Sequence, residues 1–113
     1  MKNRKSFMDY LAAYARKDLG AIDGLFADDI RLRDWKLFVQ GRRAALAETA
    51  KNFDAARSIE IDVLSTHESE RAVAGELRIL IDGELELFVV DVVEFNDSGR
   101  ICAIRAYLGR PSE

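Results

Sequence analysis

Residues 77–95 read LRILIDGELELFVVDVVEF, a run in which apolar side chains recur on both sides of Asp82-Gly83. An Asp-Gly pair between two such runs is a strong signal for a two-residue turn that joins antiparallel strands. A second turn, Asn96-Asp97-Ser98-Gly99, follows and leads into another apolar stretch from about Arg100 to Leu108. The C-terminal half therefore predicts long, hairpin-linked strands that twist and curl as a sheet.

The N-terminal half predicts three helices, because its apolar residues recur three and four positions apart. Asp18 lies where the N-cap of the second helix is expected, and Gly41 precedes the third. The apolar positions are Phe7, Tyr10, Leu11 and Tyr14 on the first helix, Leu19, Ile22, Leu25 and Phe26 on the second, and Leu46, Ala50 and Phe53 on the third. Alternation over Ile30–Asp34 predicts a short strand, followed by a short extended or irregular link at 35–40. We therefore expect an α+β domain with helices on one face of a curved antiparallel sheet.

Composition limits the classes of protein to which the chain can belong. Its 113 residues are 49% apolar and 33% charged, which is typical of a single globular domain. The 17 basic and 20 acidic side chains give a net charge of −3, which argues against a general nucleic-acid or anionic-membrane binder. No apolar run approaches the roughly 18 residues of a membrane span. One cysteine, Cys102, and no secretory signal lead us to expect a cytoplasmic protein.

Three polar residues lie on faces that are otherwise apolar. Tyr10 is on the apolar stripe of the first helix, Asp34 is in phase with Ile30, and Asp91 is in phase with Val89. A carboxylate that faces a core costs several kcal/mol unless it is paired, hydrogen-bonded or protonated. Singly, these residues also fit a core tyrosine, a solvated strand end and a paired structural carboxylate. Together they point to a site, and we expect burial to raise the pKa of Asp91.

The arrangement of these residues resembles a known family. The positions that carry the resemblance are Tyr10, the run FADDIRLRD at 26–34, Gly41, Asp91, and Asn96-x-x-Gly99 with Arg105-Ala106. Together they resemble the ketosteroid isomerase and SnoaL-like branch of the NTF2-like superfamily, from about Phe7 to Gly109. The resemblance implies that residues 1–113 form one cone-shaped domain, with helices against a curved sheet and an apolar pocket inside. It also implies a homodimer.

The resemblance also implies a chemical role for each of the three polar residues. Asp34 would be the ionised general base that removes a proton next to a ketone. Tyr10 and a protonated Asp91 would donate hydrogen bonds to the developing enolate oxygen. The chain departs from the family pattern at Trp35, where a proline usually follows the base, and at Thr49, where a supporting tyrosine is usual. The residues that we expect to contact a small apolar ligand are Trp35, Phe26, Val89, Ile104 and Ala106.

The leading hypothesis is thus an isomerase or cyclase that transfers protons next to a carbonyl group and needs no cofactor. Two alternatives are a non-catalytic domain that binds an apolar ligand, and a dimeric association module. The association module would use Phe88, Val90 and Val92, which are opposite in phase to Asp91 and should face outward. No metal site is expected, because His67 is the only histidine and no second histidine or cysteine has ligand spacing.

Overall fold

The computed structural model describes residues 2–111, so the ends of the expected 1–113 domain, residues 1 and 112–113, lie outside the described part. The described residues form three helices and six strands, in the order α1 (Lys2–Ala15), α2 (Leu19–Leu25), β1 (Phe26–Arg33), β2 (Phe38–Gln40), α3 (Arg42–Ala55), β3 (Ile59–Glu68), β4 (Ala72–Ile81), β5 (Leu85–Phe95) and β6 (Ile101–Leu108). The link at 35–40, expected to be extended or irregular, contains the short strand β2, so two strands precede the third helix.

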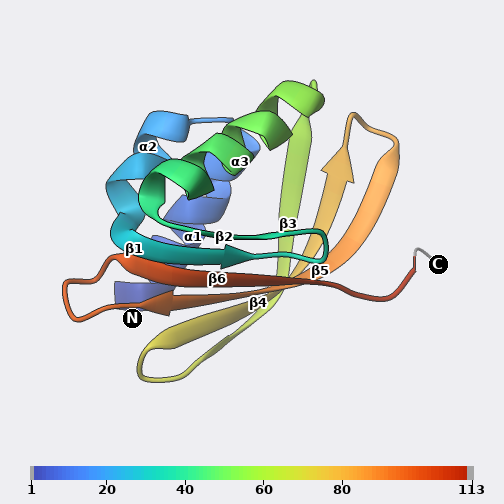
Figure 1. Ribbon diagram of the computed structural model, residues 1–113. Helices are drawn as coiled ribbons and strands as arrows, with labels where there is room; N and C mark the ends of the chain where they lie inside the picture. The colour runs from blue at the N-terminus through green and yellow to red at the C-terminus, as the bar shows by residue number, and fades with distance from the viewer. Residues whose placement is uncertain (1, 112–113) are drawn as a thin grey trace.

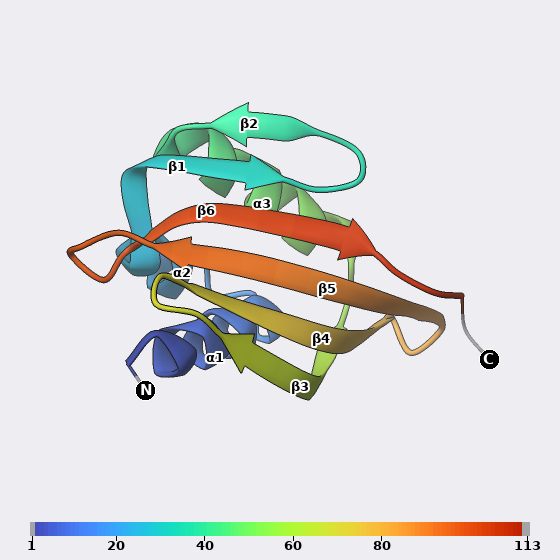
Figure 2. The same ribbon diagram turned by 90° about the horizontal axis from the view of Figure 1, so that it is seen from below.

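The strands form one sheet in the order β2-β1-β6-β5-β4-β3, and Figure 2 shows this order from the side opposite the helices. Strands β3 to β6 make the predicted antiparallel meander. The expectation of a wholly antiparallel sheet is wrong, because β1 pairs with β6 in parallel and the sheet is mixed. This pairing joins segments about 70 residues apart, and alternation within a strand does not encode which remote edge it joins.

All three helices lie on one face of the sheet, which curls around them at the β4–β5 end (Figure 1). Asp18 caps α2 as predicted, since its Oδ1 accepts a hydrogen bond from the Ala21 amide at 3.0 Å. Phe26 was expected on the second helix, but it has extended backbone angles of −82° and 138° and begins β1. Its side chain still reaches the core. None of the described helices is both long and apolar enough to cross a bilayer.

The core between helices and sheet contains an unusually close contact between α1 and β4. Phe7 is fully buried, and its ring lies directly over the backbone of Gly75. A Cβ added to Gly75 would lie 2.4 Å from Cζ of Phe7, which is closer than real Cβ atoms approach other atoms. Gly75 is the β4 partner of Asp91 in β5. The glycine therefore allows Phe7 to pack on the sheet immediately beside Asp91.

This contact leads to a stability prediction for Gly75→Ala. The new methyl group would overlap the Phe7 ring in a packed core, and we expect it to lower the free energy of unfolding by about 1–3 kcal/mol. Chemical denaturation would measure the change. Gly24→Ala is a matched control, because an added Cβ there has no neighbour within 4 Å. Equal stability of the two variants would contradict the packing argument.

The outer face of the sheet carries Phe88, Val90 and Val92, in the phase opposite to the buried Asp91. Only Val90 among them is clearly exposed, at 37%, and its cross-strand neighbour Tyr107 is 55% exposed. The Phe88 ring is covered by the Arg110 guanidinium, whose carbon lies 3.8 Å from the ring centroid. The apolar strip is thus smaller than expected, and the homodimer stays a prediction.

Candidate functional site

Tyr10 enters the interior from the buried face of α1 and is 5% exposed. Its ring centroid lies 6.0 Å from that of Tyr14, in an edge-on arrangement, and 6.2 Å from that of Phe26. The pKa of the Tyr10 hydroxyl is raised well above its usual value, first by burial and then by the charge of Asp91 and by Tyr14. Tyr10 therefore keeps its proton across the physiological range and can act as a hydrogen-bond donor.

Asp91 reaches the same interior from β5, an inner strand of the sheet, and is 8% exposed. Its partners in the register are Gly75 and Ala106, neither of which offers a polar side chain. Burial raises the pKa of Asp91 from its ordinary 3.8 to about 7, in the direction expected from the sequence. Near neutral pH a large share of the molecules therefore carries a protonated Asp91, which can donate a hydrogen bond.

The carboxyl group of Asp91 also borders accessible space. Every side-chain nitrogen or oxygen in the buried or half-buried residues of 2–111 either forms a hydrogen bond or is accessible to solvent. Burial is the cause that raises the pKa of Asp91, and no donor among residues 2–111 forms a hydrogen bond with it. The Asp91 carboxyl oxygens must therefore be accessible, and a ligand oxygen beside them could accept a hydrogen bond from the protonated carboxyl group.

Asp34 lies directly after β1, in the turn of the β1–β2 hairpin, and is half-buried. Its backbone N–H donates to the Leu37 carbonyl at 3.0 Å. Its Oδ1 accepts from the amides of Lys36 at 2.8 Å and Leu37 at 2.9 Å, which is the geometry of an Asx turn. Oδ1 thus shapes the turn while Oδ2 is not used by it, and the role of Asp34 as a general base stays a prediction.

The electrostatic effects connect these three groups through a fourth one, Tyr14. Burial is the main cause that raises the pKa of the Tyr14 hydroxyl, the hydrogen bond from Asn52 lowers it, and the charges of Asp91 and Asp34 both raise it. Asp91 acts on Tyr10 as well. Both candidate carboxylates therefore act electrostatically on one hydroxyl, and a shared site for the three predicted residues stays a prediction.

The other predicted contact residues lie at different depths. Phe26, Val89 and Ile104 are buried, and Ala106 is half-buried opposite Asp91. Trp35 is different, since it is 44% exposed in the loop between β1 and β2. A ligand in the interior would therefore meet Trp35 near the protein surface and the other four residues deeper in the core.

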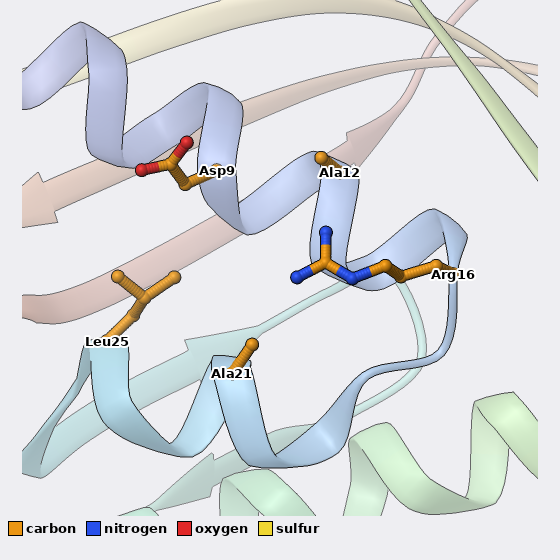
Figure 3. Close-up of a pocket in the computed structure, with 5 residues that line it drawn as sticks. All are labelled: Asp9, Ala12, Arg16, Ala21 and Leu25. Carbon is orange, nitrogen blue, oxygen red and sulfur yellow. The ribbon is translucent and has the colours of Figure 1, made fainter.

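Two open hollows lie elsewhere on the molecule, and neither is lined by Tyr10, Asp34 or Asp91. The first, of about 280 Å³, lies between α1 and α2, where Arg16 reaches between Ala12 and Ala21 (Figure 3). The second, of about 490 Å³, is polar and is lined by Ala27, Asp28, Asp29, Arg42, Asn96, Ser98 and Arg100. In the described part of the chain, no group of three histidine, cysteine or carboxylate residues could hold a metal ion.

Sequence reasoning did not single out Tyr14 and Asn52. The Asn52 side-chain N–H donates to the Tyr14 hydroxyl oxygen at 3.0 Å and joins α3 to α1. Thr49, which the family resemblance implied as a departure from a supporting tyrosine, donates its hydroxyl to the Ala45 carbonyl on its own helix. The signal that could have found Tyr14 is its spacing, because it lies one turn after Tyr10 on the same helix face.

Comparisons with known proteins identify the domain family of the chain. The sequence profile of the SnoaL-like domain matches residues 7–104. The chain belongs to the SnoaL-like domain family. A search among curated proteins finds no significant match to this SnoaL-like domain.

Solved structures described as NTF2-like proteins are similar to this SnoaL-like domain, which has the NTF2-like fold. A candidate ketosteroid isomerase from Kribbella flavida is 16% identical and has a TM-score of 0.85, over 99% of this chain and 81% of that chain. An LEH-like epoxide hydrolase from M. tuberculosis is 19% identical with a TM-score of 0.82, over 96% and 83%. A candidate polyketide cyclase from Sinorhizobium meliloti is 18% identical with a TM-score of 0.81, over 90% and 93%. At these identities the likeness concerns the fold.

Proposed function

We propose that this SnoaL-like domain is a small-molecule enzyme of the isomerase or cyclase type, which transfers a proton next to a carbonyl group. Asp34 takes a proton from the carbon beside the carbonyl, and the electrons of the broken C–H bond form an enolate. Tyr10 and protonated Asp91 donate hydrogen bonds to the enolate oxygen. Asp34 then returns the proton to another carbon of the same molecule, so that no cofactor is needed.

The observation that carries this proposal is the state of Asp91. A buried carboxyl group without a hydrogen-bond donor from residues 2–111 is costly for a protein to maintain unless it has a task. Here it borders accessible space, and burial brings its pKa to about 7. A neutral carboxylic acid at that position is a donor matched to an oxygen that becomes negative during the reaction.

Asp34 supports the proposal through its anchoring. Two backbone amides hold Oδ1, which fixes the orientation of the carboxylate and leaves Oδ2 as the atom that accepts the proton. The half-buried position keeps some contact with water. This difference between a fixed, partly hydrated Asp34 and a buried Asp91 is what opposite roles in proton transfer require.

The names of the structural neighbours describe a range of chemistry on one fold: isomerase, epoxide hydrolase and polyketide cyclase. Proton transfer next to a carbonyl is shared by isomerisation of ketones and by cyclisation of polyketides, whereas an epoxide hydrolase activates water. The buried surroundings of Asp91, with Phe26, Val89 and Ile104, support a substrate that is small and largely apolar. The enclosed apolar pocket is part of this proposal.

The proposal is tested first on the wild-type protein. We expect it to bind 4-nitrophenol, a planar mimic of an enolate, and to accelerate deuterium exchange next to the carbonyl in a panel of small cyclic ketones. General-base catalysis alone contributes about 10²–10⁴-fold, which NMR of the ketone signals would detect. Asp91→Ala should weaken binding of the phenol, because a hydrogen-bond donor is lost. The matched control is Asp29→Ala, at an exposed position of β1, which should bind the phenol as the wild type does.

The results separate the enzyme from the alternatives. Binding of the phenol without faster exchange of any ketone in the panel would favour a non-catalytic ligand-binding domain. If neither binding nor exchange is seen, the proposed pocket is wrong, and the outer face around Val90 becomes the surface to study for an association module.

A further inference from the structure

The contact between Tyr14 and Asn52 has a direction that matters for ligand binding. Asn52 Nδ2 is the donor, so the Tyr14 oxygen is the acceptor and its own proton remains available. No group of residues 2–111 accepts a hydrogen bond from that O–H. The contact joins residues 38 positions apart on α1 and α3, and thereby sets the rotation of the hydroxyl.

The ring of Tyr14 is also held in place. Its centroid lies 4.9 Å from that of Phe53 at an interplanar angle of 78°, and 6.0 Å from that of Tyr10 at 65°. Both are edge-on contacts of the kind that stabilise aromatic pairs. Because α1 carries Tyr10 and Tyr14 one turn apart, the two phenols extend from the same face of the helix.

We propose that Tyr14 donates a hydrogen bond to the same ligand oxygen or its immediate neighbour as Tyr10, and that Asn52 is the positioning residue that aims it. This inference rests on the proposed function and adds to it a third donor and a specificity element. A ligand would then need an oxygen within reach of Tyr14 as well as of Tyr10 and Asp91. Two kinds of ligand meet this requirement: those with a second hydrogen-bond acceptor beside the carbonyl group, and those with a strongly negative oxygen.

The protonation state of Tyr14 agrees with this role. Burial is the main cause that raises the pKa of its hydroxyl, the hydrogen bond from Asn52 lowers it, and the charges of Asp91 and Asp34 raise it as well. The hydroxyl therefore remains protonated at any pH at which the enzyme would work. A protonated phenol can donate a hydrogen bond to a ligand oxygen that becomes negative during the reaction.

The test uses 4-nitrophenol, whose phenolate form absorbs visible light, so that one titration gives both the affinity and the apparent pKa of the bound ligand. Tyr14→Phe removes the hydroxyl and retains the ring contacts with Phe53 and Tyr10. We expect roughly 10- to 100-fold weaker binding, because hydrogen bonds to charged groups are the stronger ones. The bound phenol should also have a higher pKa, which loss of packing alone would not produce.

Asn52→Asp tests the direction of the contact. A carboxylate at position 52 can only accept, so the Tyr14 proton would turn toward α3 and away from the ligand. We expect this variant to resemble Tyr14→Phe, although the link between the helices persists. Ala47→Asp is the matched control, because it adds the same charge to an exposed position of α3.

Each outcome is decisive. If Tyr14→Phe and Asn52→Asp both bind 4-nitrophenol as tightly as the wild-type protein, this inference is overturned and the proposed function remains intact. Weaker binding in Asn52→Asp and Ala47→Asp alike would assign the effect to charge and would also overturn it. If the wild-type protein binds no 4-nitrophenol, the proposed function and this inference fail together.

Discussion

Replacing Asp34 with asparagine is expected to slow deuterium exchange of a responsive ketone by about 10²–10⁴-fold and to leave the fold unchanged. The amide has the shape of the carboxylate but cannot take a proton at neutral pH. The structure makes this variant especially clean, because the asparagine Oδ1 can accept the same two hydrogen bonds from Lys36 and Leu37. The hairpin turn should therefore persist, and binding of 4-nitrophenol should remain.

Two comparisons isolate the role of the base. Asp29→Asn removes a carboxylate from an exposed position of β1, the strand that precedes Asp34, and should leave the exchange rate at the wild-type value. The exchange rate would be followed by NMR and the melting temperature by circular dichroism. An Asp34→Asn protein that exchanges ketone protons as fast as the wild type would remove Asp34 from the proposed reaction.

Asp91 is expected to make stability depend on pH in the direction opposite to most acidic residues. Its pKa is about 7 in the folded chain and 3.8 ordinarily, so between these values only the unfolded chain releases the proton. Stability is thus fully present below about pH 4, falls as the pH rises toward 7, and then levels. Each pKa unit corresponds to about 1.4 kcal/mol, which makes the total loss on the order of 4 kcal/mol.

The measurement is chemical denaturation from pH 4 to pH 8, with Asp91→Asn as the reference. Asparagine does not ionise, so the contributions of the other titrating groups cancel in the difference between the two proteins. Tyr10 and Tyr14 do not interfere, because their pKa values are raised from a usual value of 10. Parallel stability curves for the two proteins would show that Asp91 ionises normally and cannot be the proposed neutral donor.

Local chemistry made much of the fold predictable. Asp82 and Gly83 have positive φ angles of 56° and 70°, which their residue types favour and which the tight hairpin turn requires. The N-cap at Asp18 and the buried phase of Asp91 follow from equally local rules. Phe26 was misplaced because its helical spacing to Ile22 continues past the end of α2, and periodicity does not show where a helix gives way to a strand.

The parts that could not be predicted depend on distant partners. The parallel pairing of β1 with β6 turns an antiparallel sheet into a mixed one, and nothing within either segment specifies it. From its spacing, Tyr14 was predicted only as an apolar-face aromatic. Its contact with Asn52 could not be predicted, because only the fold brings that residue to its hydroxyl from another helix. Tyr10, Asp34 and Asp91 were singled out because a polar group on an apolar face is visible in one element alone, whereas their placement relative to one another depends on the fold.

The β1–β2 hairpin carries the proposed base, whereas the proposed oxygen site belongs to the core elements of the fold. Tyr10 and Asp91 are built into α1 and an inner strand, where any shift would disturb the core. Asp34 instead stands at the turn beside β2, an edge strand of three residues. Loops at such edges accept sequence change readily. In evolutionary terms, substitutions at residues 35–37 could redirect the base toward a different carbon atom while the oxygen site stays constant, so that one scaffold gives new regiochemistry through a single adjustable loop.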